Sequence, residues 1–280
     1  MIYGPDGADM AKLDRIVRTW RPQVPAPVRK VLVCDQCETF RHGESIGYAR
    51  YALMRIAAKG AFRFDYAQDF EELRDGRRLA QYDAILLNCT TSTEVKKHPG
   101  LECALTNFVA QGKGLCLIHA AVDSFYDSPA VQEMNGGLFW GHPWHIGGTW
   151  QFVNECPNDP ISAPLKKLGS PFRIQDEIYM QQTPPFDRSK LRVLQTIDLS
   201  EPGTRQALEV ARQRTKGRVR ADNDFAVSWV KDYGKGRVFY TTFGHDKRAW
   251  LDPARFAFML NGLQFCTGDL KTPTASVKRR

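Results

Sequence analysis

Gly112-Lys-Gly-Leu-Cys-Leu-Ile-His-Ala-Ala121 is the stretch that decides the fold. Its apolar middle is typical of a strand buried on both faces, and it leads directly into a turn of small residues. A nucleophile elbow has this geometry, in which one side chain is exposed at the top of a sheet. His119 ends the strand, whereas Cys116 lies in mid-strand without the flanking glycines of a sharp turn. We therefore interpret His119 as a pocket residue and Cys116 as a buried apolar residue.

Strands and helices alternate on the N-terminal side of this stretch. Lys30–Asp35 and Asp83–Asn88 contain continuous apolar runs, and Phe62–Tyr66 alternates between apolar and polar residues. Helical spacing separates these strands, and the predicted helices are Glu44–Lys59, Asp69–Ala80 and Leu101–Ala110. Such alternation implies parallel β-α-β units with right-handed crossovers.

The second half of the chain has a different pattern, in which separate strands follow one another. A hairpin is expected around Tyr233–Gly236, and a short helix is expected within Arg205–Lys216. The other expected elements are strands Thr149–Asn154, Ile174–Gln181, Arg192–Ile197, Phe225–Val230 and Gly236–Thr242, and a closing helix Asp252–Cys266. The sequence therefore predicts an α/β fold: a mostly parallel sheet with helices on both faces and additional antiparallel strands in the second half.

Composition divides the chain into three parts. Residues 1–29 are expected to form an N-terminal arm with a short helix at Lys12–Trp20, residues 30–268 the α/β domain, and residues 269–280 a flexible basic tail. No apolar run approaches the roughly 20 residues that a membrane helix needs. The N-terminus also lacks the apolar segment of a signal peptide. We therefore expect a cytoplasmic protein without a membrane partner.

The net charge of +8 is partly local, because basic residues alternate from Arg212 to Arg220 and end the tail. No aromatic stacking platform or nucleic-acid motif accompanies them, so a solvated loop is favoured over nucleic-acid binding. A third hypothesis, between these two, is that the basic residues bind a small anionic substrate. The role of Arg205–Arg220 stays open. The seven cysteines are an odd number, which fits a reducing compartment. Cys34 and Cys37 spell a CxxC, but Cys34 lies inside a strand and no second CxxC completes a zinc site.

Five of the six histidines stand where a common pocket is expected. His42, His119 and His245 end apolar runs abruptly, and His142 and His145 belong to the stretch Gly-His-Pro-Trp-His. Strand ends on one edge of an α/β sheet form the ligand crevice. Histidine suits both proton transfer near neutral pH and metal ligation. We expect the first three and His142 to converge on one pocket at that edge.

Other candidate side chains lie close to these histidines in the sequence. Trp140 and Trp144 could pack on a ligand face or form an aromatic mini-core under a loop. Pro143 argues against a helix-based metalloprotease motif. Asp176 and Glu177 are placed so that either could act as a general acid or base, or remain an edge carboxylate in water.

Together these motifs resemble the ThuA-like (trehalose-utilization) family, which belongs to the class I glutamine-amidotransferase-like fold. The resemblance covers about residues 30–268, and the matching segments are Phe40–His42, Gly114–Ala121, Gly136–Pro143, Asp176–Tyr179 and Gly234–Asp246. It implies a flavodoxin-like sheet with ligand chemistry at its carboxyl edge. It also implies sugar metabolism, particularly of disaccharides and their 3-keto derivatives.

The resemblance also bears on the reaction. Amidotransferases of this fold carry a cysteine nucleophile at the elbow and a His-Glu pair downstream. Here His119 stands where that cysteine would be, and His245 falls near the downstream histidine. Nothing at the elbow can form a thioester, so we do not expect a glutaminase.

We expect an enzyme that acts on a sugar or keto-sugar by acid-base chemistry, as a hydrolase, lyase or isomerase. The catalytic assignments are His119 for positioning, His245 for proton transfer and Glu177 as the other acid or base. Substrate binding is assigned to Arg41, His42, His142, Trp144, His145 and Asp246.

Two alternatives to metal-free catalysis stay open. One is a divalent metal held by two or three of the histidines His42, His119, His142, His145 and His245. The other is a non-catalytic sugar-binding or regulatory protein. No cofactor is assured, the expected partner is a small carbohydrate, and the aromatic surface is compatible with a homodimer.

Overall fold

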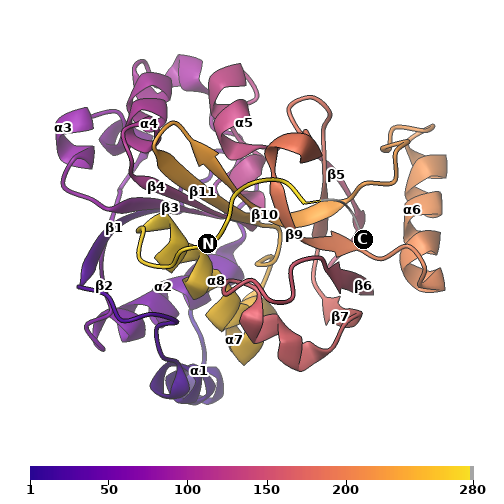
Figure 1. The fold of residues 1–280 in the computed structure, drawn as a ribbon, viewed down its shortest axis with the longest axis horizontal. Coiled ribbons are helices and arrows are strands. Elements are labelled where there is room, and N and C mark those ends of the chain that lie inside the picture. The colour runs from indigo at the N-terminus through magenta and orange to yellow at the C-terminus, as the bar shows by residue number, and fades with distance from the viewer. Residues whose placement is uncertain (278–280) are drawn as a thin grey trace.

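The computed structural model describes residues 1–277, which form an α/β fold around a nine-stranded sheet (Figure 1). The strand order is β2-β1-β3-β4-β11-β10-β9-β6-β7. Neighbours from β2 to β11 are parallel, which is the flavodoxin-like order, and the remaining pairs are antiparallel. The predicted fold class is confirmed. The last three residues of the predicted basic tail, 278–280, lie outside the described residues.

Helices cover both faces of the parallel half of the sheet. Its strands are β1 (Arg29–Cys34), β2 (Phe62–Tyr66), β3 (Ala84–Asn88), β4 (Gly114–Ile118) and β11 (Gly236–Thr241). One face carries α2 (Gly43–Ala57) and α8 (Pro253–Cys266), and the other carries α4 (Leu101–Ala110) and α5 (Pro129–Asn135). Val31 and Val33 pack into the core of the first face, and Leu32 packs into that of the second. Coverage of both faces explains the continuous apolar runs of β1, β3 and β4, whereas the edge strand β2 alternates.

The antiparallel half consists of β6 (Thr149–Asn154), β7 (Phe172–Gln175), β9 (Arg192–Ile197) and β10 (Ala226–Tyr233). β10 and β11 form the predicted hairpin, in which Tyr233 pairs with Gly236. A separate two-stranded sheet pairs β5 (Phe139–Trp144) with β8 (Ile178–Gln181). The Gly-His-Pro-Trp-His stretch therefore lies on and just beyond a strand.

The prediction of one strand over Ile174–Gln181 is wrong. The chain leaves the main sheet after Gln175 and enters the small sheet at Ile178. Between these strands, the carboxylate of Asp176 accepts hydrogen bonds from the backbone N–H groups of Gly244 and His245. These bonds hold the chain at the break, which also contains Glu177.

Capping residues explain three other differences from the predicted helices. Asp69 and Asp75 each accept from a following backbone N–H, so the predicted helix Asp69–Ala80 is divided into a 3-10 helix η1 (Phe70–Leu73) and α3 (Gly76–Leu79). Asp6 and Glu201 likewise start α1 (Gly7–Thr19) and α6 (Pro202–Arg214) earlier than predicted. The elements not predicted, besides α5 and β5, are α7 (Lys247–Leu251) and the 3-10 helices η2 (Val95–Lys97), η3 (His119–Val122), η4 (Ala163–Leu168) and η5 (Arg188–Lys190).

Both ends of the described chain contact the domain. Leu13 and Trp20 of the arm are buried in the core beside α2. Near the other end, the hydroxyl of Thr272 donates to Asp159. No helix within residues 1–277 is long and apolar enough to cross a membrane.

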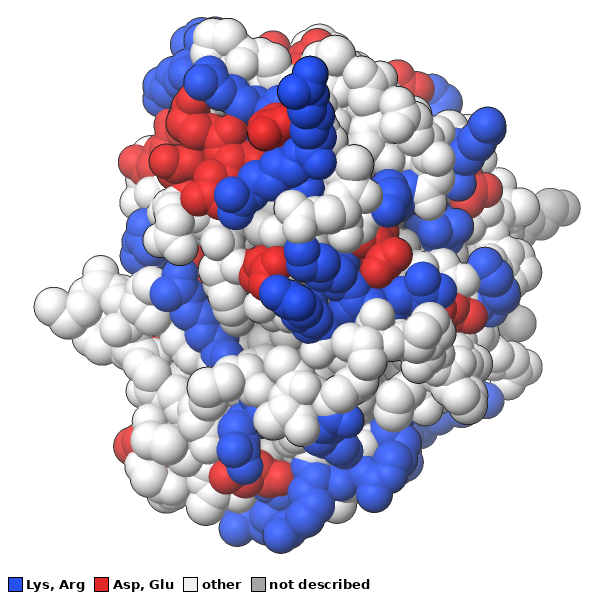
Figure 2. Space-filling model, turned by 90° about the vertical axis from the view of Figure 1, so that its left-hand side faces the viewer, with Lys and Arg blue, Asp and Glu red and all other residues white. Residues whose placement is uncertain are grey.

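Basic and acidic side chains are interspersed on the face at the β2 edge of the sheet (Figure 2). Ion pairs around η1 and α3 include Arg74 with Glu71 and Arg78 with Glu72. These ion pairs balance part of the charge on this face.

Candidate functional site

His119 occupies a backbone elbow at the end of β4. Its φ of +51° is in the left-handed region, which few residues other than glycine adopt, and its side chain is fully buried. The Nδ1 atom lies 2.6 Å from the carbonyl oxygen of Thr242. Because a carbonyl oxygen only accepts, Nδ1 donates this hydrogen bond, and Nε2 is the ring nitrogen left to face the site. The sharp turn that the small residues predict is therefore present, with His119 at its tip.

Gly244 allows the loop after β11 to approach this elbow closely. Its φ is +135°, and a Cβ atom there would lie 2.8 Å from Cγ2 of Ile118 and 3.4 Å from Cβ of His119. A side chain at this position would collide with the elbow. The glycine thus places the next residue, His245, beside His119.

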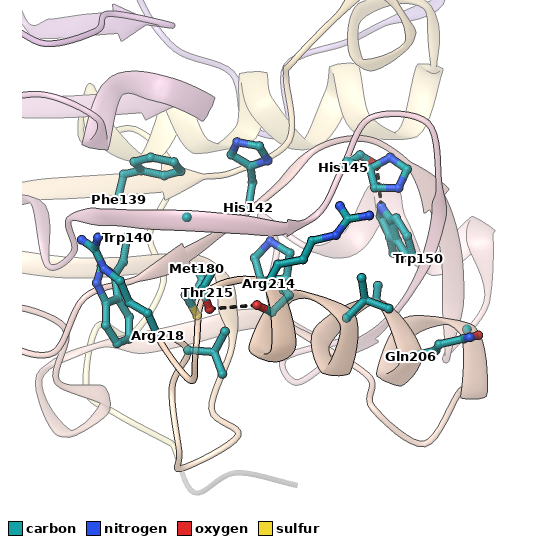
Figure 3. A pocket seen from close by; sticks show the side chains of 17 residues that line it. Phe139, Trp140, His142, His145, Trp150, Met180, Gln206, Arg214, Thr215 and Arg218 are labelled. Atoms are coloured by element: carbon teal, nitrogen blue, oxygen red, sulfur yellow. Dashed lines mark hydrogen bonds between the residues drawn. The ribbon is translucent and has the colours of Figure 1, made fainter.

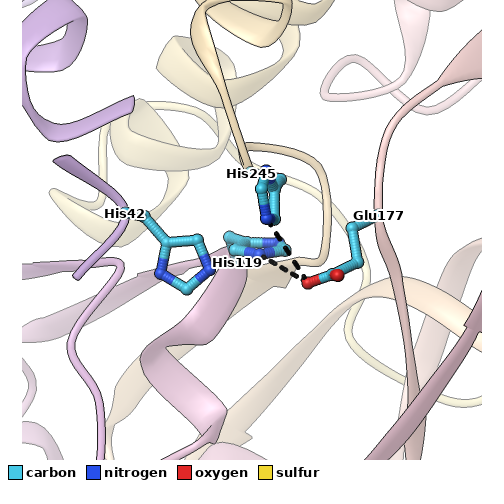
Figure 4. A group of neighbouring side chains, drawn as sticks. All are labelled: His42, His119, Glu177 and His245. Carbon is cyan, nitrogen blue, oxygen red and sulfur yellow. Dashed lines mark ion pairs between the residues drawn. The ribbon is translucent and has the colours of Figure 1, made fainter. Parts of the chain in front are cut away.

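Four side chains from distant parts of the chain converge at the carboxyl edge of the sheet (Figure 4). His42 caps α2 after β1, His119 follows β4, His245 follows β11, and Glu177 lies in the break between β7 and β8. One potential ligand atom from each residue lies within 4.8 Å of those of the other three. We call this set the histidine cluster.

Glu177 is the centre of the ionic contacts of the site. Its Oε2 atom lies 3.7 Å from Nε2 of His119 and 3.7 Å from Nε2 of His245. Its Oε1 atom lies 3.4 Å from Nδ1 of His142, which β5 supplies through its pairing with β8. The structure thus brings together His42, His119, His142 and His245, as expected from their positions after strands and in the Gly-His-Pro-Trp-His stretch.

Burial and mutual repulsion keep two of these imidazoles neutral. Burial, followed by the neighbouring His119 and His245, lowers the pKa of His42 to about 2. Burial and His119 also lower the pKa of His245. For Glu177, burial acts to raise the pKa, but hydrogen bonding and the charges of the surrounding imidazoles outweigh it and lower the pKa. The site therefore presents an ionised carboxylate among imidazoles.

Asp176 and Glu177 are separated into different roles by the strand break. Asp176 is buried beside the buried Arg255, whose Nη1 lies 3.2 Å from its carboxylate. The same carboxylate accepts from the N–H groups of Gly244 and His245 at 3.0 and 3.2 Å. Asp176 therefore holds the loop that carries His245, whereas Glu177 faces the imidazoles.

Several other predicted site residues lie away from the cluster. Trp144 is fully buried on the α6 side of β5, where its indole N–H donates to the carbonyl oxygen of Thr204. His145 is exposed, and its ring contacts Trp150 edge-on. Asp246 accepts from the N–H of Arg248 and caps α7, so its carboxylate is engaged at a helix start.

Arg41, the remaining predicted binding residue, is partly exposed and directly precedes His42. Beside it, Phe40 is 63% exposed and lies edge-on against the ring of His42, with 4.8 Å between centroids. Both therefore lie at the solvent-facing side of the cluster.

Sequence reasoning missed three contributors to the site. Tyr179 packs its ring 4.5 Å from that of His119, and Phe139 stacks on His142. Asp123 ends η3, and its largely buried position raises its pKa. The signal for Asp123 was its position just after β4, and that for Tyr179 was its place in the Asp-Glu-Ile-Tyr motif.

The cysteine beneath the elbow is part of the core. Cys116 is 1% exposed, and burial raises the pKa of its thiol well above the usual value. This burial confirms the interpretation of Cys116 as an apolar core residue. The thiol of Cys37 points to the backbone carbonyl of Cys89, and the seven cysteines, all of which lie within residues 1–277, form no disulfide.

A cavity of about 760 Å³ lies between β5 and α6 (Figure 3). Its lining includes Trp140, Trp150, Arg214 and Arg218. Phe139 and His142 also border it, but in Figure 3 their rings project from the opposite side of β5 to α6. The strand thus lies between this cavity and the histidine cluster.

Comparisons with known proteins agree with the fold. A family model described as ThuA, trehalose utilisation, matches residues 30–266. No curated protein matches the chain. Among solved structures, a ThuA-like protein from Bacteroides uniformis has a TM-score of 0.63 at 18% identity, covering 87% of this chain and 93% of its own.

Two further structures are similar. A ThuA-like protein from Parabacteroides merdae has a TM-score of 0.58 at 17% identity, with 90% of this chain and 98% of its own covered. A protein from Salmonella typhimurium described as cytoplasmic has a TM-score of 0.53 at 12% identity, with 85% and 98% covered. At these identities the structural likeness shows the fold alone.

Proposed function

The chain belongs to the ThuA family, whose description is trehalose utilisation, and from this premise we propose that it is an enzyme of carbohydrate metabolism. We propose a sugar or 3-keto-sugar as substrate, a disaccharide derivative in particular. The reaction moves a proton at a carbon next to a carbonyl, because a keto group makes the neighbouring C–H acidic enough for a modest base.

The contacts of Glu177 are the observation that carries this proposal. Its carboxylate lies within 3.4–3.7 Å of His119, His142 and His245, and its pKa is lowered. It is therefore ionised and able to accept a proton near neutral pH. The side chain of His142 is 49% exposed, so it can exchange protons with a substrate or with water.

In the proposed first step, Glu177 removes the proton from the carbon beside the keto group, and the C–H electron pair forms an enolate. A protonated imidazole then supplies a proton and becomes neutral. In elimination the enolate re-forms the keto group and a C=C bond while the glycosidic C–O bond breaks, and the departing oxygen takes the proton. In isomerisation the former carbonyl carbon takes the proton, and the adjoining hydroxyl gives its proton to a base as it becomes the new carbonyl. Neither outcome uses a thiol nucleophile.

The position of Cys116 supports a mechanism without a thioester. The elbow carries His119, and Cys116 lies buried in mid-strand with a raised thiol pKa. A neutral, buried thiol is a poor nucleophile. This supports acid-base chemistry over a glutaminase reaction.

The test is turnover of a 3-keto-disaccharide such as 3-keto-trehalose, together with exchange of its acidic C–H in D₂O followed by NMR. Glu177→Gln keeps the shape of the side chain but removes the base, and is expected to lower both rates by about 10²–10⁴-fold. His98→Gln, which changes a histidine outside the site, is the control. Substrate binding by the wild type without turnover or exchange would instead favour a sugar-binding protein.

A further inference from the structure

We infer that the histidine cluster is a binding site for a first-row divalent transition metal, with His42, His119, His245 and Glu177 as ligands. This inference deepens the proposed function. The metal site is argued from the geometry of the cluster, and only its role in catalysis rests on the proposed function. The ligand set differs from one chosen by sequence alone, because it includes a carboxylate and leaves out His142 and His145.

The separations of the ligand atoms suit such an ion. Metal–nitrogen and metal–oxygen bonds of about 2.0–2.2 Å in a tetrahedral site place ligand atoms about 3.3–3.6 Å apart. Oε2 of Glu177 lies 3.7 Å from Nε2 of both His119 and His245, and all four ligand atoms lie within 4.8 Å of one another. The two 3.7 Å pairs need to close by only a few tenths of an ångström and the widest pair by about 1.2 Å, which small side-chain rotations on binding can supply.

Unpartnered ring nitrogens are a second argument. Nδ1 of His119 donates to the carbonyl oxygen of Thr242, so Nε2 is the ring nitrogen that faces Oε2 of Glu177. This nitrogen is buried without a hydrogen-bond partner among residues 1–277, and so is Nδ1 of His42. Buried polar atoms without partners are costly. A cation bound within the cluster gives such nitrogens a partner.

The surroundings are those of a supported metal site. A ligating histidine usually donates its other ring N–H to a carbonyl or carboxylate, as His119 does to Thr242. Asp176, paired with Arg255, fixes the backbone that carries His245. The ligands therefore come from positioned segments rather than from mobile side chains.

The donor set defines the class of metal. Imidazoles favour Zn²⁺, Fe²⁺, Co²⁺ and Ni²⁺, and a carboxylate adds tolerance for Mn²⁺. Mg²⁺ and Ca²⁺ prefer oxygen ligands and are not expected to bind well to three imidazoles. Such a metal supplies Lewis-acid polarisation of the carbonyl oxygen of a keto-sugar.

This ligation changes the division of labour within the site. His119 and His245 become ligands, so they no longer transfer protons. His142 is the imidazole left free: it contacts Oε1 of Glu177, not Oε2, and it is half exposed. His142 then exchanges protons with the substrate.

Metal binding is tested directly on the full-length protein. After chelation and dialysis, Co²⁺ is titrated while the visible absorption of ligand-field bands is recorded, and the metal content of untreated protein is measured by mass spectrometry. A saturating signal at about one Co²⁺ per chain is expected. A featureless titration, or the absence of stoichiometric metal together with turnover that resists chelation, would overturn the inference.

Three variants assign the ligands. His245→Gln removes a ligand that is only partly buried and should weaken Co²⁺ binding by more than about 10–100-fold, the usual loss for a merely supporting residue. His142→Gln should bind Co²⁺ normally while turnover falls, and the control His98→Gln should resemble the wild type. Circular dichroism of the metal-free variants checks that they fold.

The outcomes separate this inference from the proposed function. Normal Co²⁺ binding by His245→Gln would overturn the ligand assignment, as would equal loss in His98→Gln. Stoichiometric metal without turnover of any keto-sugar would leave the metal site standing and contradict the proposed reaction. Turnover by metal-free protein that does not take up Co²⁺ would contradict the metal site and leave the proposed reaction standing.

Discussion

His98 and the histidine cluster show how the ratio of imidazoles to carboxylates affects the pKa of a histidine. His98 lies between two carboxylates: Nδ1 is 2.8 Å from Glu71 and Nε2 is 2.9 Å from Glu38. Burial acts to lower its pKa, but the two carboxylates outweigh burial and raise it. In the histidine cluster, two buried imidazoles and the partly buried His245 share one carboxylate, and the pKa of His42 falls to about 2.

The comparison shows that a histidine side chain can act as a cation in one part of the molecule and as a neutral ligand or base in another. Two carboxylates raise the pKa of His98 and favour its cationic form, which ties two segments together. Burial and neighbouring imidazoles lower the pKa of His42 and His245 and favour their neutral forms, which suit ligation or base chemistry. The predictions below test this difference, beginning with the support of the cluster and ending with His98.

The largest effect is expected when the buried support of the cluster is broken. Arg255→Met should lower the free energy of unfolding by about 3–5 kcal/mol, because it leaves the buried Asp176 carboxylate without its charged partner. Urea unfolding measures this change. Adding Asp176→Asn to the Arg255→Met variant should recover much of the loss, and a double variant no more stable than the single one would contradict this account.

A smaller effect is expected from crowding the elbow. Gly244→Ala should cost about 1–3 kcal/mol, because its Cβ would press on Ile118 and the backbone φ is +135°. It should also displace His119 and lower turnover by about 10²-fold if the shift reaches 1 Å. Gly60→Ala, where a Cβ meets nothing within 4 Å, is the matched control. Equal loss of turnover in the two variants would show that crowding is not the cause.

Burial should keep the thiol beneath the elbow neutral, as it does the imidazoles above it. Cys116→Ala should keep turnover and lose about 1 kcal/mol of stability, from the small cavity it creates. In the native protein, alkylation followed by peptide mass spectrometry should label the exposed Cys103 rapidly and leave Cys116 unmodified. Labelling of both at similar rates, with loss of turnover, would revive a thiol mechanism.

The smallest effect is expected from His98, and it depends on pH. Because its folded pKa is raised, the bridge stabilises the protein fully below the unfolded pKa of about 6.5 and loses this contribution as pH rises through the folded value. His98→Gln should therefore lower Tm by at most a few degrees at pH 5.5 and have no effect at high pH. The exposed His145→Gln is the control, and a pH-independent loss in His98→Gln would contradict the charged bridge.

The parallel half of the fold could be predicted closely from the sequence. The bounds of β2 and α4 match the expected ones, and β4 is the apolar middle of Gly112–Ala121. A strand buried on both faces forms a continuous apolar run, the edge strand β2 alternates, and Gly112 ends the helix before β4. The break between β7 and β8 could not be predicted. Its cause is a set of hydrogen bonds from Asp176 to the Gly244–His245 loop, which is distant in the sequence.

The candidate site could be predicted in part because residues that follow neighbouring parallel strands meet at one edge of the sheet. The meeting of His119 and His245 follows from their places after neighbouring parallel strands. His142 lies on β5 and His145 just beyond its end, and only knowledge of the β5–β8 pairing shows that His142 is the one that meets Glu177. Arg255 gave no signal, since an arginine on an amphipathic helix is normally expected to face water.

The members of the histidine cluster come from the beginning, the middle and the end of the domain, and this has a consequence for assembly. The four residues span positions 42–245, so the cluster forms only when the strands that precede its histidines, β1, β4 and β11, have assembled in the sheet. Anything that binds all four side chains acts on the global folding equilibrium rather than on a local loop. At a hundredfold excess over its Kd, such a ligand would add about 2.7 kcal/mol to the stability of the entire domain through mass action.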